Sequence, residues 1–345
     1  MNDSHLGTEL FEEAFSLENL IGAYCRARRG KQKRDEVVRF GWNLEANLLK
    51  LRAELLSGSY AHGPYRRFVV SDSKRREIKA APFCDRVVHQ AIIAALEPLF
   101  ERRFVFDSYA CRRGKGTRAA LSRFEKYLRL SRYALTMDVS KYFASIDHSI
   151  LLSLLRTCVR DERMRALLKI IVESAEDRPG TGIPIGNLTS QLFANVYLDE
   201  LDQYVKHVLR ARRYVRYMDD FVILHDDKAH LHALKGEIAA FLATRLRLIA
   251  HPRKAQVAPT SRGIEFLGYR VFPHHRLLRK STVKRFLSRA KAAKRAGGGV
   301  FRRIRSARGL PGRAKGIRAA SCARSRSVWT ISGLSQMIIN NYQRV

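Results

Sequence analysis

The stretch Arg216–Leu224, with the sequence RYMDDFVIL, constrains the fold more than any other part of the chain. Its two adjacent carboxylates, Asp219 and Asp220, come directly before the apolar run Phe221–Leu224, which is typical of a buried strand. We expect a hairpin turn at Asp219-Asp220 that lifts both carboxylates out of the sheet. Neighbouring ionised carboxylates repel one another and persist readily only where cations neutralise them. Because an Asp-Asp pair alone is more often a solvated turn, its meaning depends on a second acidic segment.

That second segment is Tyr133–Asp147. Tyr133–Met137 predicts a buried strand, and Asp138 falls at its end. A single Asp in such a place usually caps a helix or forms a turn. Together, however, the two segments supply strand-end carboxylates that can meet side by side in one sheet. Such a cluster can hold two Mg²⁺ ions, which prefer oxygen ligands. Two ions about 3.5–4 Å apart stabilise the attacking and the leaving oxygen of a phosphoryl transfer.

Three motifs, in family order along the chain, resemble the reverse transcriptases. Tyr217–Asp220 is similar to their YxDD box, Asp138 followed by Phe143 matches their first palm motif, and Gly182–Asn195 lies between the two. The resemblance implies an α+β fold of the right-hand polymerase type, with fingers, thumb and an antiparallel palm sheet. It also implies an RNA-directed DNA polymerase that uses two Mg²⁺ ions, with Mn²⁺ able to substitute.

The resemblance also implies which residues form the site. The catalytic residues are Asp138, Asp219 and Asp220, and the metal ligands are these three with the backbone carbonyl of Val139. The nucleotide-binding candidates are Lys74, Arg76, Phe143, Ile185, Gly186, Gln191 and Lys254. The primer grip is Phe266, Leu267, Gly268 and Tyr269, on a strand expected over Phe266–Phe272 and preceded by a hairpin at Arg262-Gly263.

The implied roles of the nucleotide-binding residues differ. Lys74 and Arg76, on a basic hairpin, contact the incoming triphosphate. Phe143 lies under the sugar of the nucleotide and leaves no room for a 2′-hydroxyl. Lys254 lies near the leaving pyrophosphate and can act as a general acid. A solvated hairpin, a core phenylalanine and a solvated loop lysine are the simpler alternatives, and they stay open.

The chain departs from many reverse transcriptases at Ile185-Gly186 and Ser190-Gln191, where Gln-Gly and Ser-Pro are common. This departure resembles the enzymes of diversity-generating retroelements, which copy template adenines inaccurately. Gly186, without a Cβ, lets the backbone approach the nascent base pair closely. Ile185 cannot form the side-chain hydrogen bond that glutamine can. Losing one such bond costs on the order of 1–3 kcal/mol of selectivity, or roughly ten- to a hundredfold, so the sequence predicts low fidelity.

By this resemblance the protein makes cDNA from a template-repeat RNA for mutagenic retrohoming. Its partners are the RNA template, a DNA or RNA primer, dNTPs and a small basic accessory protein. A group II intron-like or retron reverse transcriptase is the alternative within the family. A non-catalytic RNA-binding protein is the alternative from another class.

The formal net charge of +33 over 345 residues indicates a polyanionic partner. Repulsion of this size disfavours a compact state unless an anion compensates it, and nucleic acid binds such proteins through its phosphates. A ribosomal protein would show the same charge, so charge alone does not separate a binder from an enzyme. The sequence contains no apolar run of membrane-spanning length. Five scattered cysteines without a CxxC pair favour a reducing cytoplasm. The resemblance to retroelement enzymes implies a bacterial or phage-encoded protein.

We expect three parts along the chain: fingers with the start of the palm over residues 1–132, a palm with the catalytic motifs over 133–278, and a basic thumb or tail over 279–345. Helical periodicity predicts helices over 10–57, 83–100, 119–128, 151–175 and 228–246. After Gly297 the composition turns to Arg, Gly, Ser and Ala. A divergent thumb, a segment ordered only by RNA and a non-native end of the reading frame all remain open there.

Overall fold

The structure is a computed structural model that describes residues 9–71, 75–174, 178–284 and 287–288. The predicted helical segment 10–57 forms four helices: α1 (Leu10–Ala14), α2 (Leu17–Arg28), α3 (Asp35–Trp42) and α4 (Leu44–Leu56). Helix α2 begins after Ser16, whose hydroxyl accepts a hydrogen bond from the Asn19 backbone N–H at 3.2 Å, as an N-cap does. Helices α1, α2 and α3 pack against α5 (Phe83–Glu101), the long helix predicted over 83–100, and α4 packs on α2 and α3.

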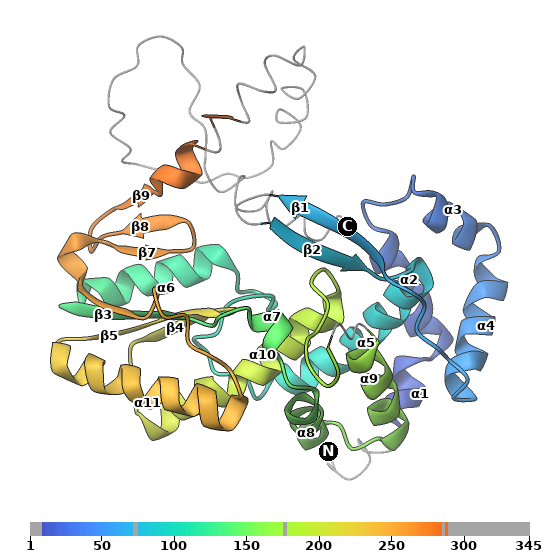
Figure 1. Cartoon of the computed structure of the whole chain (residues 1–345). Helices are drawn as coiled ribbons and strands as arrows, with labels where there is room; N and C mark the ends of the chain where they lie inside the picture. The colour runs from blue at the N-terminus through green and yellow to red at the C-terminus, as the bar shows by residue number, and fades with distance from the viewer. Residues whose placement is uncertain (1–8, 72–74, 175–177, 285–286, 289–345) are drawn as a thin grey trace.

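A β-hairpin connects the first four helices to α5. Its strands are β1 (Arg66–Ser71) and β2 (Arg75–Ala80), paired antiparallel with Phe68 opposite Ile78. The Lys79 backbone N–H donates to the Ile185 carbonyl at 3.2 Å, which ties the hairpin to a segment more than a hundred residues later. Figure 1 shows the hairpin reaching from the helical half toward the part of the chain that carries the larger sheet.

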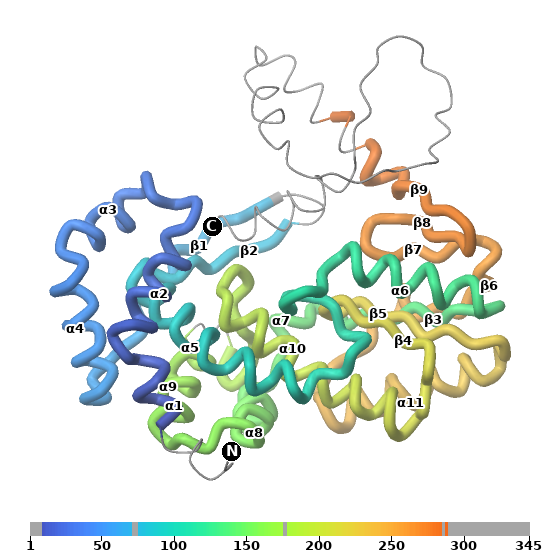
Figure 2. Tube along the Cα trace, turned by 180° about the vertical axis from the view of Figure 1, so that it is seen from behind, coloured from blue at the N-terminus to red at the C-terminus, as the bar shows by residue number. Residues whose placement is uncertain are grey.

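The central element is a four-stranded antiparallel sheet in the order β4-β5-β3-β6. Its strands are β3 (Tyr133–Asp138), β4 (Tyr214–Tyr217), β5 (Asp220–His225) and β6 (Gln256–Pro259). Figures 1 and 2 both show α6 (Thr117–Arg129) on one face of this sheet and α11 (Lys228–Leu246) on the other. The predicted helices over 119–128 and 228–246 are confirmed, and the structure places one on each face of the sheet.

The four middle residues of β5, Phe221–Leu224, are apolar because both faces of the strand are buried there. Phe221 and Ile223 belong to the core that includes α10 (Leu188–Gln203) and α11, whereas Val222 and Leu224 belong to the core beneath α6. Successive side chains of a strand point to opposite faces, so an unbroken apolar run suits a sheet covered on both sides. This arrangement explains why the sequence shows a continuous run here rather than an alternating pattern.

Between β3 and β4 the chain is helical. Helices α7 (Tyr142–Ser145), α8 (His148–Cys158) and α9 (Glu162–Glu173) precede α10 (Leu188–Gln203), which continues into a π-helical turn at Tyr204–Val208. The segment predicted as one mostly helical stretch, 151–175, is thus divided between two helices. Helix α10 is buried along most of its length and packs against both α5 and α11.

A small three-stranded sheet follows β6 and corrects one prediction. The segment Phe266–Phe272 is not one strand, because β7 (Ile264–Phe266) and β8 (Tyr269–Val271) pair antiparallel, followed by β9 (Arg276–Leu278). The hairpin turn lies at Leu267-Gly268, where φ is +48° and +84°, and not at Arg262-Gly263. Alternating apolar residues fit either arrangement, and the pairing of Phe266 with Tyr269 decides for a hairpin turn at Leu267-Gly268.

The described residues thus form a mixture of helices and antiparallel sheets, as predicted. Within them, no helix combines the length and the apolarity that crossing a bilayer requires. Most of the predicted thumb or tail, including everything after Gly297, lies outside the described residues.

Candidate active site

The two-residue connection between β4 and β5 carries the first carboxylate. Tyr217 pairs with Asp220, so the turn consists of Met218 and Asp219. Met218 has a φ of +58° and Asp219 does not have a positive φ, the combination found in type II′ hairpin turns. The predicted turn at Asp219-Asp220 is therefore one residue too late. Asp220 is the first residue of β5, and it stays in the sheet.

The register of β3 and β5 brings the second carboxylate to the same place. Asp138, at the end of β3, lies directly opposite Asp220 in the antiparallel pair. Opposite residues of such a pair project from the same face of the sheet. Asp219 is the turn residue directly before Asp220. The sheet thus gathers at one edge the three carboxylates that the sequence predicted to meet.

The pKa values of the Asp219 and Asp220 carboxyls are both raised. Burial, followed by the charge of Asp138, raises the pKa of Asp219. Burial, followed by the charges of Asp138 and Asp219, raises the pKa of Asp220 to about 8. Lys254 acts in the opposite direction on both pKa values. Burial is the largest cause of both shifts and the repulsion between the carboxylates adds to it, a repulsion that a bound cation would relieve.

Lys254 is the side chain in direct contact with the cluster. Its ammonium group forms an ion pair with the Asp138 carboxylate, and its backbone carbonyl accepts a hydrogen bond from Thr136 Oγ1 at 3.2 Å. Within the described ranges, no three His, Cys, Asp or Glu side chains form a ready-made metal site. The donor chemistry nevertheless fits a hard divalent ion, because all three groups are carboxylates whose mutual repulsion such an ion would relieve.

Of the two cations predicted on the hairpin, Arg76 lies close enough to the site for its charge to lower the pKa of Asp219. It is an exposed residue of β2. Lys74 lies outside the described residues. Strand β2, which carries Arg76, therefore reaches toward the carboxylates.

Val139 and Phe143 follow Asp138 toward α7. Val139 is buried and forms an isolated antiparallel bridge with Ala250. Phe143 is half-buried, packs edge-to-face on Tyr142 with ring centroids 5.6 Å apart, and accepts a backbone hydrogen bond from Ile183 at 2.9 Å.

The Ile185–Gln191 segment contacts strand β2 of the β1–β2 hairpin. Gly186 has a φ of +116°, and a Cβ placed on it would meet Ile78 Cγ2 at 2.9 Å. Both its φ and the close approach of β2 exclude a larger residue. Ile185 is half-buried and bonded through its carbonyl to Lys79. Gln191 lies in the first turns of α10, which begins at Leu188.

The predicted primer grip is a hairpin. Phe266 and Tyr269 are paired across it and buried against α6, whereas Leu267 and Gly268 form its tip. Phe266 and Tyr269 thus lie in strands, whereas Leu267 and Gly268 do not.

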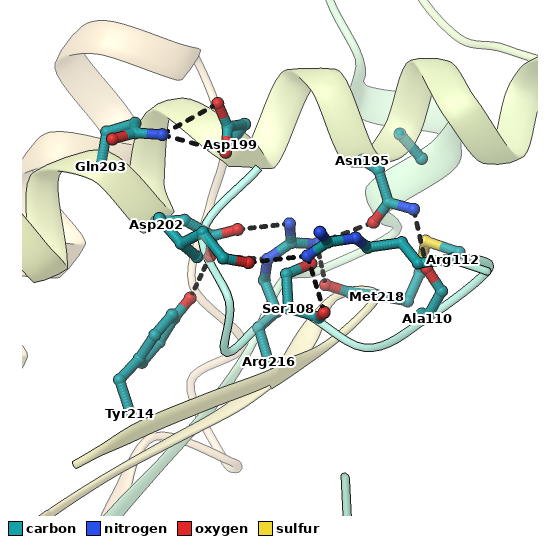
Figure 3. A network of polar contacts seen from close by, with 12 residues as sticks. Ser108, Ala110, Arg112, Asn195, Asp199, Asp202, Gln203, Tyr214, Arg216 and Met218 are labelled. Carbon is teal, nitrogen blue, oxygen red and sulfur yellow. Dashed lines mark hydrogen bonds and ion pairs between the residues drawn. The ribbon is translucent and has the colours of Figure 1, made fainter. Parts of the chain in front are cut away.

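The sequence-based prediction did not include Arg216 and its partners, which Figure 3 shows beside Met218 of the β4–β5 turn. Arg216 donates to both carboxylate oxygens of Asp202, at 2.7 and 2.5 Å, and to the Met218 carbonyl at 3.1 Å. The signal was an arginine in a short strand that is otherwise apolar, since a buried arginine requires an acidic partner. Asp202, fourteen residues earlier on a helix, could not be identified as that partner from the sequence.

Comparisons with known proteins agree with this geometry. The family described as "Reverse transcriptase (RNA-dependent DNA polymerase)" matches residues 70–271, a range that includes every carboxylate of the cluster. "Protein YkfC" of Escherichia coli (strain K12) is 29% identical, with 69% of this chain and 72% of that protein covered. "Group II intron-encoded protein LtrA" of Lactococcus lactis subsp. cremoris is 23% identical, with 70% of this chain covered. The chain spans about half of LtrA, 51% of its length.

Proposed function

The chain belongs to the reverse transcriptase family, and we propose that it is an RNA-directed DNA polymerase that extends a DNA or RNA primer with dNTPs. The observation that carries the proposal is the meeting of Asp138, Asp219 and Asp220 at one sheet edge. In this proposal residues 1–132 form the fingers with the start of the palm, 133–278 the palm, and 279–345 the thumb.

We further propose that Asp138 and Asp219, with the Val139 carbonyl, hold two Mg²⁺ ions, for which Mn²⁺ can substitute. When bound, such ions supply charge stabilisation at the attacking and leaving oxygens. Asp220 supports the site electrostatically. Lys254, which pairs with Asp138, leaves that carboxylate when an ion binds there and can then donate a proton toward the departing pyrophosphate.

The remaining residues select the nucleotide in this proposal. Arg76, whose charge already reaches Asp219, contacts the triphosphate together with Lys74. Phe143 places the edge of its ring beneath the sugar and excludes a 2′-hydroxyl. Gly186, Ile185 and Gln191 line the side of the nascent base pair, and the hairpin Phe266–Tyr269 positions the primer end.

Within the family, we propose an enzyme of a diversity-generating retroelement, error-prone at template adenines and working with a template-repeat RNA and a small basic accessory protein. Ile185 supports this, because an apolar side chain cannot supply a hydrogen bond that senses nucleotide geometry. The similarity to a group II intron-encoded protein supports the second candidate, a group II intron-like enzyme that copies its template more faithfully.

Primer extension on matched RNA and DNA templates tests the proposal, with the products sequenced. The proposed polymerase extends a primer on RNA in the presence of Mg²⁺ and dNTPs. Errors concentrated opposite adenine favour the diversity-generating element, whereas evenly distributed rare errors favour the intron-like enzyme. No extension on RNA, even with a basic accessory protein and the cognate RNA present, would instead indicate a non-catalytic RNA-binding protein.

A further inference from the structure

Arg216 heads the fully buried side chains of the described residues by volume, and it lies only two residues before Met218. Its side chain and that of Asp202 have 0% exposure. The guanidinium forms a two-pronged pair with Asp202 and also donates through Nη1 to Asn195 Oδ1 at 3.2 Å and to the Met218 carbonyl at 3.1 Å. All three of its nitrogens are therefore hydrogen-bonded, with Asp202 and Asn195 of helix α10 on one side and Met218 on the other (Figure 3).

The bond from Arg216 to the Met218 carbonyl holds a residue of the turn that has an unfavourable backbone conformation. Met218 has a φ of +58°, a conformation that a residue with a side chain adopts only at a cost. Its carbonyl belongs to the same planar peptide unit as the N–H of Asp219. Fixing the direction of that carbonyl therefore fixes the peptide plane from which the Asp219 side chain departs.

The anchor itself is held from several directions. Asp202 also accepts a hydrogen bond from the Tyr214 hydroxyl at 2.6 Å. Asn195 donates to the Ala110 carbonyl at 2.8 Å. The Arg216 backbone N–H donates to the Asp107 carbonyl at 2.9 Å. The guanidinium thus links the turn to a part of the protein that has little freedom to move.

We propose that Arg216 is a positioning residue for nucleotide addition, and that its Asp202-locked guanidinium holds the Met218–Asp219 peptide so that the Asp219 carboxylate faces Asp138. This inference rests on the proposed polymerase function. A buried ion pair is by itself weak support for folding stability, because desolvation offsets its attraction. The contact with the turn gives this pair a role that an apolar pair of similar size could not take.

The role requires arginine rather than any cation. A planar guanidinium offers several donors in a fixed fork and can serve Asp202, Asn195 and Met218 at once. A lysine ammonium is a point charge on a flexible stem, so it cannot reproduce the two-pronged pair and the bond to Met218 together. Arg216→Lys therefore keeps the charge and removes the geometry.

Four proteins test the inference: wild type, Arg216→Lys, Arg216→Met combined with Asp202→Asn, and Arg103→Met as control. Arg103 also bonds to helix α10, through Asp199 and Glu200, but has no contact with the turn among the interactions of the described residues. The double variant removes both charges of the buried pair, so neither partner is left as an unpaired charge in the core. The measurements are melting temperature, single-turnover rate, KM for dNTP and Mn²⁺ binding.

We expect Arg216→Lys and the double variant to lower the single-turnover rate by about 10- to 100-fold, the size of loss that a displacement near 1 Å produces. KM for dNTP should stay within about twofold, and Mn²⁺ binding should weaken in both. Arg103→Met should lower the melting temperature without these losses.

Wild-type rate and Mn²⁺ binding in the double variant would overturn the inference, as would a rate that follows the melting temperature across all four proteins. If the wild type does not polymerise, the proposed function fails first. Mn²⁺ binding then decides separately whether Arg216 positions Asp219, because unchanged binding in the variants would refute it.

Discussion

Asp138 of β3 and Asp220 of β5 are direct cross-strand partners, although more than eighty residues separate them in the chain. Like charges in such positions destabilise a sheet, and here the pKa of Asp220 rises to about 8, from burial first and from Asp138 and Asp219 next. A fold has little reason to keep this arrangement for stability alone. Bound cations would neutralise the three carboxylates and so remove the repulsion between them.

Replacing Gly186 should destabilise the contact between the 185–191 segment and the hairpin. Gly186→Ala forces a side chain into a φ of +116° and against Ile78, so we expect the free energy of unfolding in urea to fall by about 1–3 kcal/mol. Gly236→Ala is the matched control, since Gly236 lies within α11 and nothing approaches its Cβ position within 4 Å. That change should raise the free energy of unfolding by about 0.5–1 kcal/mol. Equal stability of Gly186→Ala and wild type would rule out the close approach.

His89 should make the protein sensitive to acid. Burial, followed by the charges of His62 and Arg86, lowers the pKa of His89 from 6.5 to about 3. The folded state thus binds this proton less readily than the unfolded state, so stability is complete above about pH 6.5 and falls as the pH drops toward 3. Between pH 6.5 and 5 the loss should be about 2 kcal/mol.

His89→Leu should remove that part of the pH dependence, measured as the free energy of unfolding at pH 7 and pH 5. His232→Leu, at an exposed position of α11, should leave the dependence unchanged. A wild-type pH dependence in His89→Leu would mean that another group titrates.

Phe143→Ala should relax sugar selection. If the half-buried ring of Phe143 occupies the space of a 2′-hydroxyl, its removal should raise the ratio of rNTP to dNTP incorporation by roughly ten- to a hundredfold, equivalent to about 1–3 kcal/mol. Parallel single-nucleotide incorporation assays with dGTP and GTP measure this ratio. Phe143→Tyr, which keeps a ring, is the control and should keep the preference for dNTP. An unchanged ratio in the alanine variant would assign Phe143 to the core.

Ile185→Gln should raise fidelity opposite adenine. The glutamine restores a side chain able to hydrogen-bond beside Gly186, and such a bond contributes on the order of 1–3 kcal/mol of discrimination. Sequenced products of RNA-templated extension should show errors at adenine reduced by about tenfold or more. Ile185→Leu, of similar size and without polar atoms, should copy like the wild type. An identical error spectrum in the glutamine variant would remove this explanation of low fidelity.

The carboxylates were predictable from the sequence because local signals mark them. The apolar runs before Asp138 and after Asp220 identify two strands, and the family motifs give their order. The turn was misplaced by one residue because only the pairing of Tyr217 with Asp220 determines which two residues remain unpaired. Strand register is a property of both strands together.

Other features depend on contacts that no local pattern contains. Leu267-Gly268 divides an alternating run into two strands, and that run fits one strand equally well. The pairing of Arg216 with Asp202 joins a strand to a helix, and an arginine beside YMDD could equally have faced solvent. Lys254 was expected near the leaving pyrophosphate. Its ion pair with Asp138 could not be predicted, because it depends on the pairing of β6 with β3, just after Lys254 in the chain.

The most direct measurement of the central claim is single-turnover dNTP incorporation on an RNA template by wild type, Asp138→Asn, Asp219→Asn and Asp226→Asn. Asp226 follows the far end of β5, is exposed and pairs with Arg213, so it receives the same chemical change away from the cluster. Asp138→Asn and Asp219→Asn should each lower the rate by at least about 100-fold, while melting temperatures and primer–template binding stay near those of the wild type. Asp226→Asn should retain the wild-type rate. Near-wild-type incorporation by Asp138→Asn or Asp219→Asn would contradict the claim that this cluster is the polymerase active site.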